Sequence, residues 1–151
     1  MLTHIHDYDL AFWLFGAPGA VRATGGHLSY LELDVEDTAD ATLTTPACPV
    51  RVRQSFASRT SERAIAVRGD RASAALDLVA ARLTVSPPLA PDVVLADYQR
   101  NQMFVDEAAH FLDCIEGGAT PAIPLAEGAA VLGIALAVKS AMKSARTLEL
   151  T

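Results

Sequence analysis

The sequence predicts an α+β fold: a single, mostly antiparallel β-sheet with helices packed on one face and no Rossmann domain. Residues 21–85 contain short β-type segments separated by turn residues. This spacing permits hairpins but has no room for parallel crossovers of about a dozen or more residues. Segments with helical periodicity lie before and after the strands. The length of 151 residues fits one core, so we expect residues 1–151 to form a single domain.

The first element is a short helix over residues 3–15. Its apolar residues recur at steps of three and four: Ile5, Tyr8, Phe12 and Phe15. Thr3 can cap the start of this helix. Gly16 and Pro18 stand where it would end.

The β-type segments follow the first helix. They cover residues 21–24, 27–33, 39–44, 50–56, 63–67, 74–78 and 81–85. Turn formers such as Gly25-Gly26 and Gly69-Asp70 separate them, so neighbouring strands are expected to pair as antiparallel hairpins.

Two more helices are predicted after a connector that contains Pro87, Pro88 and Pro91. The helix over residues 94–116 carries one apolar stripe and ends at Gly117-Gly118. The stripe consists of Phe104, Ala108, Phe111 and Ile115. The helix over residues 125–144 is apolar on nearly every face, so we expect it to be deeply buried. Residues 147–150 are expected to add an edge strand.

Charge and hydropathy exclude several classes of protein. The net charge is −6 and the pI is near 5.1, whereas nucleic acids and anionic membranes select clustered Lys and Arg. The longest apolar run, residues 129–138, is far shorter than the roughly 20 residues that span a bilayer. The N-terminus shows no signal peptide. We therefore expect a cytoplasmic protein with no nucleic-acid or membrane partner.

The start of the chain carries the residues best suited to chemistry. His6, Asp9 and Trp13 are spaced so that they project from one face of the first helix. An imidazole beside a carboxylate can shuttle a proton near neutral pH, so His6 is the candidate acid/base and Asp9 the candidate orienting residue. The competing interpretation is a histidine bonded to a neighbouring Asp for structure alone.

Metal binding is a second competitor, because His4, His6 and Asp7 form an H-x-H-D cluster. Two histidines two positions apart share a face on a strand but not on a helix, and the flanking periodicity is helical. We therefore predict no metal site. Elsewhere, Tyr98 and Asn101 precede the core of the second helix and are weak candidates for substrate binding.

Residues 6–16 read H-D-Y-D-L-A-F-W-L-F-G and resemble the H-x-x-D-x-x-x-W-L-x-G stretch of Gfo/Idh/MocA oxidoreductases. Four later runs resemble the same family in the same order. They are residues 35–39 (V-E-D-T-A), 65–69, 104–118 and 125–141. The resemblance implies the C-terminal, substrate-side domain of an NAD- or NADP-dependent oxidoreductase that acts on a sugar, polyol or related hydroxylated compound.

In that family the His matching His6 works at the substrate hydroxyl with an Asp four positions earlier and a Lys from the nucleotide-binding domain. This chain departs from the pattern, because the earlier position holds Leu2. No G-x-G-x-x-G fingerprint lies between a strand and a helix. We therefore expect no cofactor on this chain alone, and NAD or NADP only in a complete enzyme, so the chain is not expected to transfer hydride by itself.

The partners follow from the architecture. A sheet with helices on one face leaves the other face open, so we expect a homo-oligomer that pairs these open faces. A separate Rossmann-domain partner would complete the enzyme. The alternative function is a non-catalytic module that dimerises and binds a small ligand.

Overall fold

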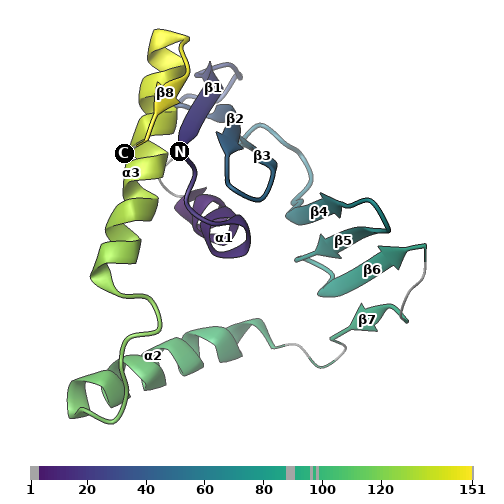
Figure 1. Ribbon diagram of the computed structural model, residues 1–151, viewed down its shortest axis with the longest axis vertical. Helices are drawn as coiled ribbons and strands as arrows, with labels where there is room; N and C mark the ends of the chain where they lie inside the picture. Colours follow the sequence, from purple (N-terminus) through teal and green to yellow (C-terminus); the bar gives the residue numbers. More distant parts are fainter. Residues whose placement is uncertain (1–3, 88–90, 96, 98, 151) are drawn as a thin grey trace. The chain divides into compact units, whose positions relative to one another are not determined.

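The computed structural model describes residues 4–87, 91–95, 97 and 99–150 (Figure 1). Its helices and strands follow in chain order: α1 (Ile5–Phe15), β1 (Ala20–Gly26), β2 (Thr38–Thr44), β3 (Pro49–Ser55), β4 (Ala64–Arg68), β5 (Ser73–Asp77), β6 (Arg82–Ser86), β7 (Val93–Val94), α2 (Arg100–Glu116), α3 (Leu125–Ser144) and β8 (Leu148–Glu149). The chain divides into two compact units. Met1–Ser58 together with Ala122–Thr151 form what we call the core unit, and Arg59–Pro121 form the inserted unit.

The sheet of the core unit has the strand order β3-β2-β1-β8, and all of its strand pairs are antiparallel. Alternate residues point to one face, as the two-residue period of a strand requires. This inner face is apolar apart from Gln54; it consists of Val21, Ala23, Ala39, Ala41, Leu43, Val52 and Gln54. Because these side chains cannot face water, the inner face has to be covered.

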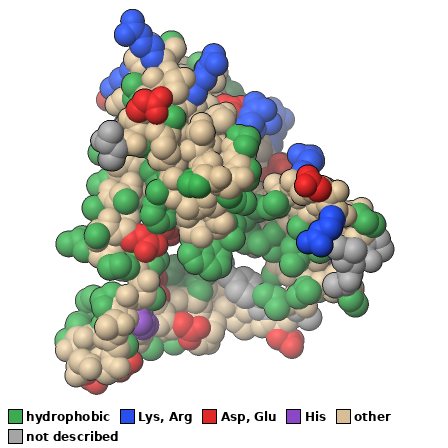
Figure 2. All heavy atoms as spheres, in the orientation of Figure 1, with side chains coloured by type: hydrophobic (Ala, Val, Ile, Leu, Met, Phe, Trp, Pro, Cys, Tyr) green, Lys and Arg blue, Asp and Glu red, His purple; other side chains and the backbone are tan. Residues whose placement is uncertain are grey.

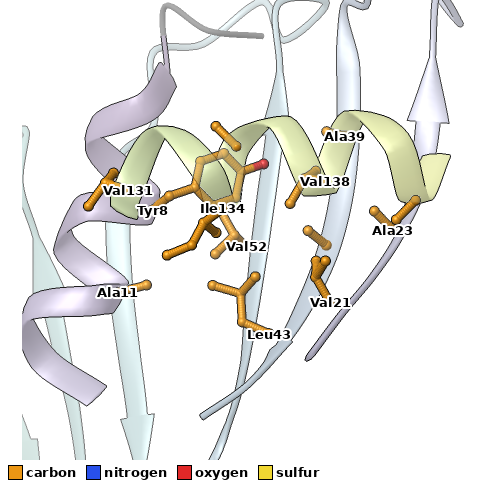
Figure 3. Close-up of a cluster of buried hydrophobic side chains, with 13 residues drawn as sticks. Tyr8, Ala11, Val21, Ala23, Ala39, Leu43, Val52, Val131, Ile134 and Val138 are labelled. Atoms are coloured by element: carbon orange, nitrogen blue, oxygen red, sulfur yellow. The ribbon is translucent and has the colours of Figure 1, made fainter. Parts of the chain in front are cut away.

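Helices α1 and α3 provide that cover. Tyr8 and Ala11 of α1 are buried with five residues of α3, namely Val131, Ile134, Ala135, Val138 and Ala141. Figure 3 shows these side chains meeting those of Val21, Leu43 and Val52 from the strands. This cluster is the hydrophobic core of the unit.

The outer face of the same sheet is polar. It consists of Arg22, Thr24, Thr38, Asp40, Thr42, Thr44, Arg51, Arg53 and Ser55. The carboxylate of Asp40 accepts two hydrogen bonds from Arg51, at 2.8 Å from Nε and 2.6 Å from Nη2. Arg53 lies 3.4 Å from the same carboxylate. The Arg51 hydrogen bonds and the two positive charges outweigh partial burial and lower the pKa of Asp40.

The inserted unit contains a second antiparallel sheet of order β4-β5-β6-β7. A turn closed by the Gly69 N–H and the Ala72 carbonyl, 2.9 Å apart, joins β4 to β5. Asp77 accepts hydrogen bonds from the N–H groups of Val79 and Ala80 and closes the next turn. Helix α2 has no buried residue among those described.

The α+β class, its antiparallel pairing and the three helices are confirmed. The expectation of one sheet was wrong, because the described strands form two sheets. Strand β4 pairs with β5 across the tight turn at Gly69 and does not pair with β3, which is an edge strand of the first sheet. The strand expected over residues 27–33 was also wrong, since this segment is a loop. The single-domain assignment stays a prediction.

Helix α3 also differs from its prediction. It was expected to be buried on all sides, yet only one side lies in the core and Leu132 and Leu136 are exposed. By length and apolarity α3 could cross a membrane, but its packing against β1 and α1 accounts for it as a core helix. Helix α2 begins at Arg100 rather than residue 94, because Val93 and Val94 pair with β6 as β7.

Gly25 provides a test of this packing. Its φ of +152° disfavours any side chain, and a Cβ there would meet the Thr38 carbonyl oxygen, Cα of Ala39 and the Met142 sulfur. We expect Gly25→Ala to lower the free energy of unfolding by about 1–3 kcal/mol in urea denaturation, because of overpacking. Gly26 has a φ of +147° but open space around it. Gly26→Ala is therefore the control and should cost less; equal losses would contradict the steric explanation.

Candidate functional site

The start of α1 is fixed to the sheet by one side chain, the amide of Gln54. Its Nε2 donates to the His4 carbonyl at 2.8 Å and to the carboxylate of Asp7 at 3.1 Å. Its Oε1 accepts from the Tyr8 hydroxyl at 3.2 Å. Gln54 is buried on β3 opposite Ala39. A buried amide must satisfy its donors and acceptor, so these bonds fix where α1 begins.

Tyr8 connects the hydrogen bonds of Gln54 to the hydrophobic core. Its side chain has no exposed surface and lies in the core, while its hydroxyl reaches Gln54. Burial, and secondarily the negative charge of Asp7, raise the pKa of Tyr8 well above its ordinary value of 10.0. Tyr8 is therefore a neutral hydrogen-bond donor at physiological pH. It has a structural role and is not available as a base.

His6 projects from the side of α1 that does not pack on the sheet. Tyr8 and Ala11 define the buried side, whereas His6 is exposed and Asp9 is half-buried. Trp13, two turns after His6, is 73% exposed. Among the described residues the structure records no hydrogen bond between His6 and Asp9. It therefore places the two predicted residues one turn apart on α1.

The other predicted residues lie elsewhere. Asn101 is exposed at the beginning of α2, within the inserted unit. Tyr98 and Leu2 fall outside the described residues. The roles of His6, Asp9, Tyr98 and Asn101 therefore stay predictions. Among the residues that the structure describes, no three His, Cys, Asp or Glu side chains are grouped to hold a metal ion.

The structure adds a residue that the sequence analysis overlooked: Asp37, between β1 and β2. Its carboxylate has no exposed surface. It accepts from the Leu28 N–H at 3.0 Å, and from the Ser29 N–H and hydroxyl at 3.0 Å and 2.8 Å. His27 Nδ1 lies 3.2 Å from the same carboxylate. These contacts fold residues 27–36 into a closed loop in place of the expected strand.

Hydrogen bonding determines the charge state of Asp37. The donors, led by the Leu28 N–H and followed by Ser29 and Thr38, outweigh burial and hold the pKa of Asp37 well below 3.8. Asp37 also joins the loop to both neighbouring strands. Its N–H donates to the Gly26 carbonyl at 3.0 Å, and its carbonyl accepts from the Phe56 N–H at 2.9 Å. Asp37 is the Asp of the V-E-D-T-A run, which the sequence analysis identified only by its resemblance to the family.

Glu36 and Lys139 connect the loop to α3. Lys139 Nζ lies 3.2 Å from Glu36 Oε2, and both side chains are mostly buried. Burial tends to raise the pKa of Glu36, but a backbone hydrogen bond and Lys139 outweigh it, so the pKa of Glu36 is lowered. The ion pair holds the C-terminal half of α3 beside the loop.

A narrow crevice lies where these features meet, at the start of α1 and β2 and the end of β3. It is lined by His4, Glu36, Asp37, Thr38, Ala39, Gln54, Ser55 and Phe56. His4 closes one side, with its ring edge-on to Phe56 at a centroid distance of 4.6 Å. A second, open depression is lined by His27 and residues 29–34 of the Asp37 loop. The crevice holds about 10 Å³, room for about one water, whereas the depression holds about 490 Å³, which is in the range of small-molecule sites.

The described strands offer no place for a dinucleotide. Every strand pair is antiparallel, and no strand–helix–strand unit of the parallel type surrounds a glycine turn in the described ranges. Nicotinamide dinucleotides bind at the carboxyl ends of parallel strands, at the N-terminus of a helix. The residues present therefore do not fit this cofactor.

The chain resembles a known domain family in sequence and several oxidoreductases in fold. The sequence profile of the GFO/IDH/MocA C-terminal domain matches residues 1–75. The fold matches the WlbA dehydrogenase of Bordetella pertussis, solved with NADH and UDP-GlcNAcA, with a TM-score of 0.75 and 18% identity. The match covers 99% of this chain and 46% of that one. The chain belongs to the GFO/IDH/MocA C-terminal domain family.

Two further structures resemble this GFO/IDH/MocA domain. UDP-N-acetylglucosamine 3-dehydrogenase GnnA from Acidithiobacillus ferrooxidans is 26% identical, with a TM-score of 0.75, over 93% of this chain and 45% of that one. The aldose-aldose oxidoreductase of Caulobacter crescentus is 22% identical, with a TM-score of 0.74, over 97% and 45%. No curated protein sequence matches the chain. The GFO/IDH/MocA domain thus spans less than half of each of these solved chains.

Asp37 gives the domain a specific acid sensitivity. Because its folded-state pKa lies below its ordinary value, the stabilisation is complete above about pH 4 and is lost as the pH falls further. We expect Asp37→Asn to lower the free energy of unfolding at pH 7 and to flatten its decline between pH 5 and 3, measured by urea denaturation. Asp34→Asn, in the same loop but exposed, is the control. An unchanged acid slope in Asp37→Asn would contradict the assignment.

Proposed function

We propose that this chain is the substrate-side domain of an NAD- or NADP-dependent oxidoreductase that acts on a sugar, polyol or related hydroxylated compound. Family membership supports the proposal, because the matched region includes α1 and its His6. The observation that carries it is the position of His6, exposed on a helix whose start Gln54 fixes to the sheet. A poised imidazole on a fixed element is what proton transfer to a bound hydroxyl requires.

His6 acts in this proposal as the acid/base. When a substrate hydroxyl becomes a carbonyl its proton has to leave, and an exposed neutral imidazole can accept it near neutral pH. Asp9 follows one turn later and orients the ring once a substrate is bound. Leu2 occupies the position where the family has an Asp, so Asp9 is the carboxylate within reach on the same helix. Asn101, and Tyr98 outside the described residues, remain weak candidates for substrate binding.

The proposed cofactor and the proposed cellular location are those of the complete enzyme. NAD or NADP would be bound by a nucleotide-binding domain, on the same polypeptide or a separate one, and would supply the hydride chemistry. The chain alone would not transfer hydride. A cytoplasmic location is part of the same proposal.

The solved relatives and the depression beside the Asp37 loop support a sugar-like substrate. The relatives include a UDP-N-acetylglucosamine 3-dehydrogenase and an aldose-aldose oxidoreductase. In this chain His27, Ser29 and Tyr30 line the open depression of about 490 Å³ beside the Asp37 loop, where they present ring nitrogen and hydroxyl groups. Such groups hydrogen-bond sugar hydroxyls.

The experiment that tests the function restores a nucleotide-binding half. The half of the A. ferrooxidans 3-dehydrogenase that this chain does not cover is fused ahead of Met1, and NADH formation is followed with UDP-N-acetylglucosamine and a panel of aldoses. We expect turnover, and we expect His6→Asn to lower kcat about 10²–10⁴-fold with little change in substrate binding. Asp9→Asn should lower kcat less.

His110→Asn is the control, because the proposal gives this histidine of α2 no role. Equal activity of His6→Asn and the parent fusion would remove His6 from the mechanism. Saturable sugar binding without turnover in any fusion would favour the non-catalytic ligand-binding module. Micromolar binding of NAD(H) by the isolated chain, measured by calorimetry, would contradict the proposal that another domain binds the cofactor.

We also propose that the chain self-associates through the outer face of the core-unit sheet. The helices leave this face uncovered, and Thr24, Thr42 and Thr44 lie on it beside the Asp40–Arg51 ion pair. A second copy placed on the same face would bury these side chains.

Sedimentation velocity tests this association. We expect the wild-type chain to be oligomeric at micromolar concentration. Thr42→Arg adds a charge between Arg22 and Arg51, its neighbours across the strands, and should shift the chain toward monomer. Leu136→Arg, on the helical side of the unit, should leave the mass unchanged. A monomeric wild type would count against the contact.

A further inference from the structure

The Asp37 loop presents an aromatic ring on a fixed backbone. Tyr30 is 76% exposed and lines the depression of about 490 Å³. The N–H groups of Leu28 and Ser29, just before it, donate to the Asp37 carboxylate. The Leu31 N–H, just after it, donates to the Ser29 hydroxyl at 3.2 Å. A ring held in this way offers a flat apolar surface, and the C–H groups of a sugar pack on the electron-rich face of an aromatic ring.

His27 lines the same depression, and the direction of its ring is set by Asp37. Its Nδ1 lies 3.2 Å from the Asp37 carboxylate, which is ionised and can only accept a hydrogen bond. This contact favours the tautomer that carries its proton on Nδ1, and Nε2 is then an acceptor. The His27 side chain is 45% exposed, so a ligand hydroxyl can donate to Nε2.

The charge of the depression distinguishes between kinds of sugar. Glu32 and Asp34 are exposed carboxylates that line it, and the described residues of the lining include no Lys or Arg. Basic side chains lie elsewhere on the core unit. Figure 2 shows them at the end of α3, at the top of the view, where Lys143 stands in the last turn. A diphosphate needs Arg, Lys or the N-terminus of a helix, whereas a carboxylate accepts hydrogen bonds from hydroxyl and ammonium groups.

We propose that the depression binds the ring of an uncharged sugar or an amino sugar, and that Glu32 and Asp34 exclude nucleotide-diphosphate sugars. This inference rests on the proposed function and narrows its substrate class. Tyr30 packs against the face of the sugar ring, and His27 accepts a hydrogen bond from one of its hydroxyls. Asp37 also lines the crevice at the start of α1, so the depression lies at the end of the core unit where α1 begins.

An NMR titration of the isolated chain tests the proposal with three probes that share one sugar ring. The probes are N-acetylglucosamine, which is uncharged, glucosamine, which is cationic, and UDP-N-acetylglucosamine, which is anionic. We expect the first two to shift the amide resonances of residues 29–34 and the Nε2 resonance of His27. Their dissociation constants should be at least about fivefold lower than that of UDP-N-acetylglucosamine at low salt. Added salt should narrow the difference, because it screens the carboxylates.

Matched substitutions separate the charge from the aromatic contact. Glu32→Gln removes one carboxylate from the depression and should strengthen binding of UDP-N-acetylglucosamine about twofold relative to N-acetylglucosamine. Glu149→Gln removes the same charge from β8, which pairs with the end of β1 farthest from the loop, and should leave this ratio unchanged. Tyr30→Ala should weaken the binding of all three probes.

Two results would overturn the proposal. Absence of shifts in residues 27–34 with every probe would show that the depression is not a sugar site. Equal or tighter binding of UDP-N-acetylglucosamine, with the same ratio in Glu32→Gln, would remove the selection by charge.

The titration needs neither cofactor nor turnover, so its failure is distinct from failure of the proposed function. Sugar binding in the depression together with an inactive fusion would support the site and count against the proposed activity. Turnover of the fusion without shifts at the depression would support the activity and count against the site.

Discussion

The buried amide of Gln54 is the interaction on which the candidate site depends. All of its recorded partners lie within the first five described residues, so the orientation of α1 follows from a single position on β3. A buried amide that lost these partners would carry the full cost of desolvation, about 1–3 kcal/mol. The network therefore resists rotation of α1. Because Tyr8 is held inward, His6, two residues earlier, has to face outward.

The same end of the core unit carries a second polar network, around Asp37 and Glu36. A buried carboxylate collects the N–H groups of the loop, and an ion pair joins that loop to α3. The two networks fix the walls of the crevice between them and the conformation of the Asp37 loop, since each element is bonded to its neighbour. A loop held in this way loses little freedom when a ligand binds in the depression that it lines.

Apolar residues at helical steps predicted α1 and α2, and a long apolar run predicted α3. The strand predictions failed where tertiary contacts override propensity. Residues 27–33 have β-type composition. The Asp37 carboxylate, however, accepts hydrogen bonds from the N–H groups of Leu28 and Ser29, which are then not free to pair with a neighbouring strand. Val93 and Val94 follow the prolines of the connector, and Val94 was assigned to the next helix, yet both pair with β6.

The site was predictable only in part. His6 and Asp9 were found from helical spacing and family resemblance, since both signals lie in one short run. Gln54 could not be found in the same way. The two-residue period of β3 places Gln54 on the same face as Val52, but its polar side chain gave no sign of the helix that buries it. A local sequence pattern carries no information about hydrogen-bond partners that lie far away in the chain.

The pairing of Val21 with Leu148 and of Ala20 with Glu149 makes the core unit discontinuous in sequence. During translation, β1, β2 and β3 leave the ribosome before the whole inserted unit, and α3 and β8 follow it. At about 5–20 residues per second, the apolar face of the nascent sheet stays without its second helix for several seconds. Chaperone engagement of the nascent chain should therefore be concentrated in that interval.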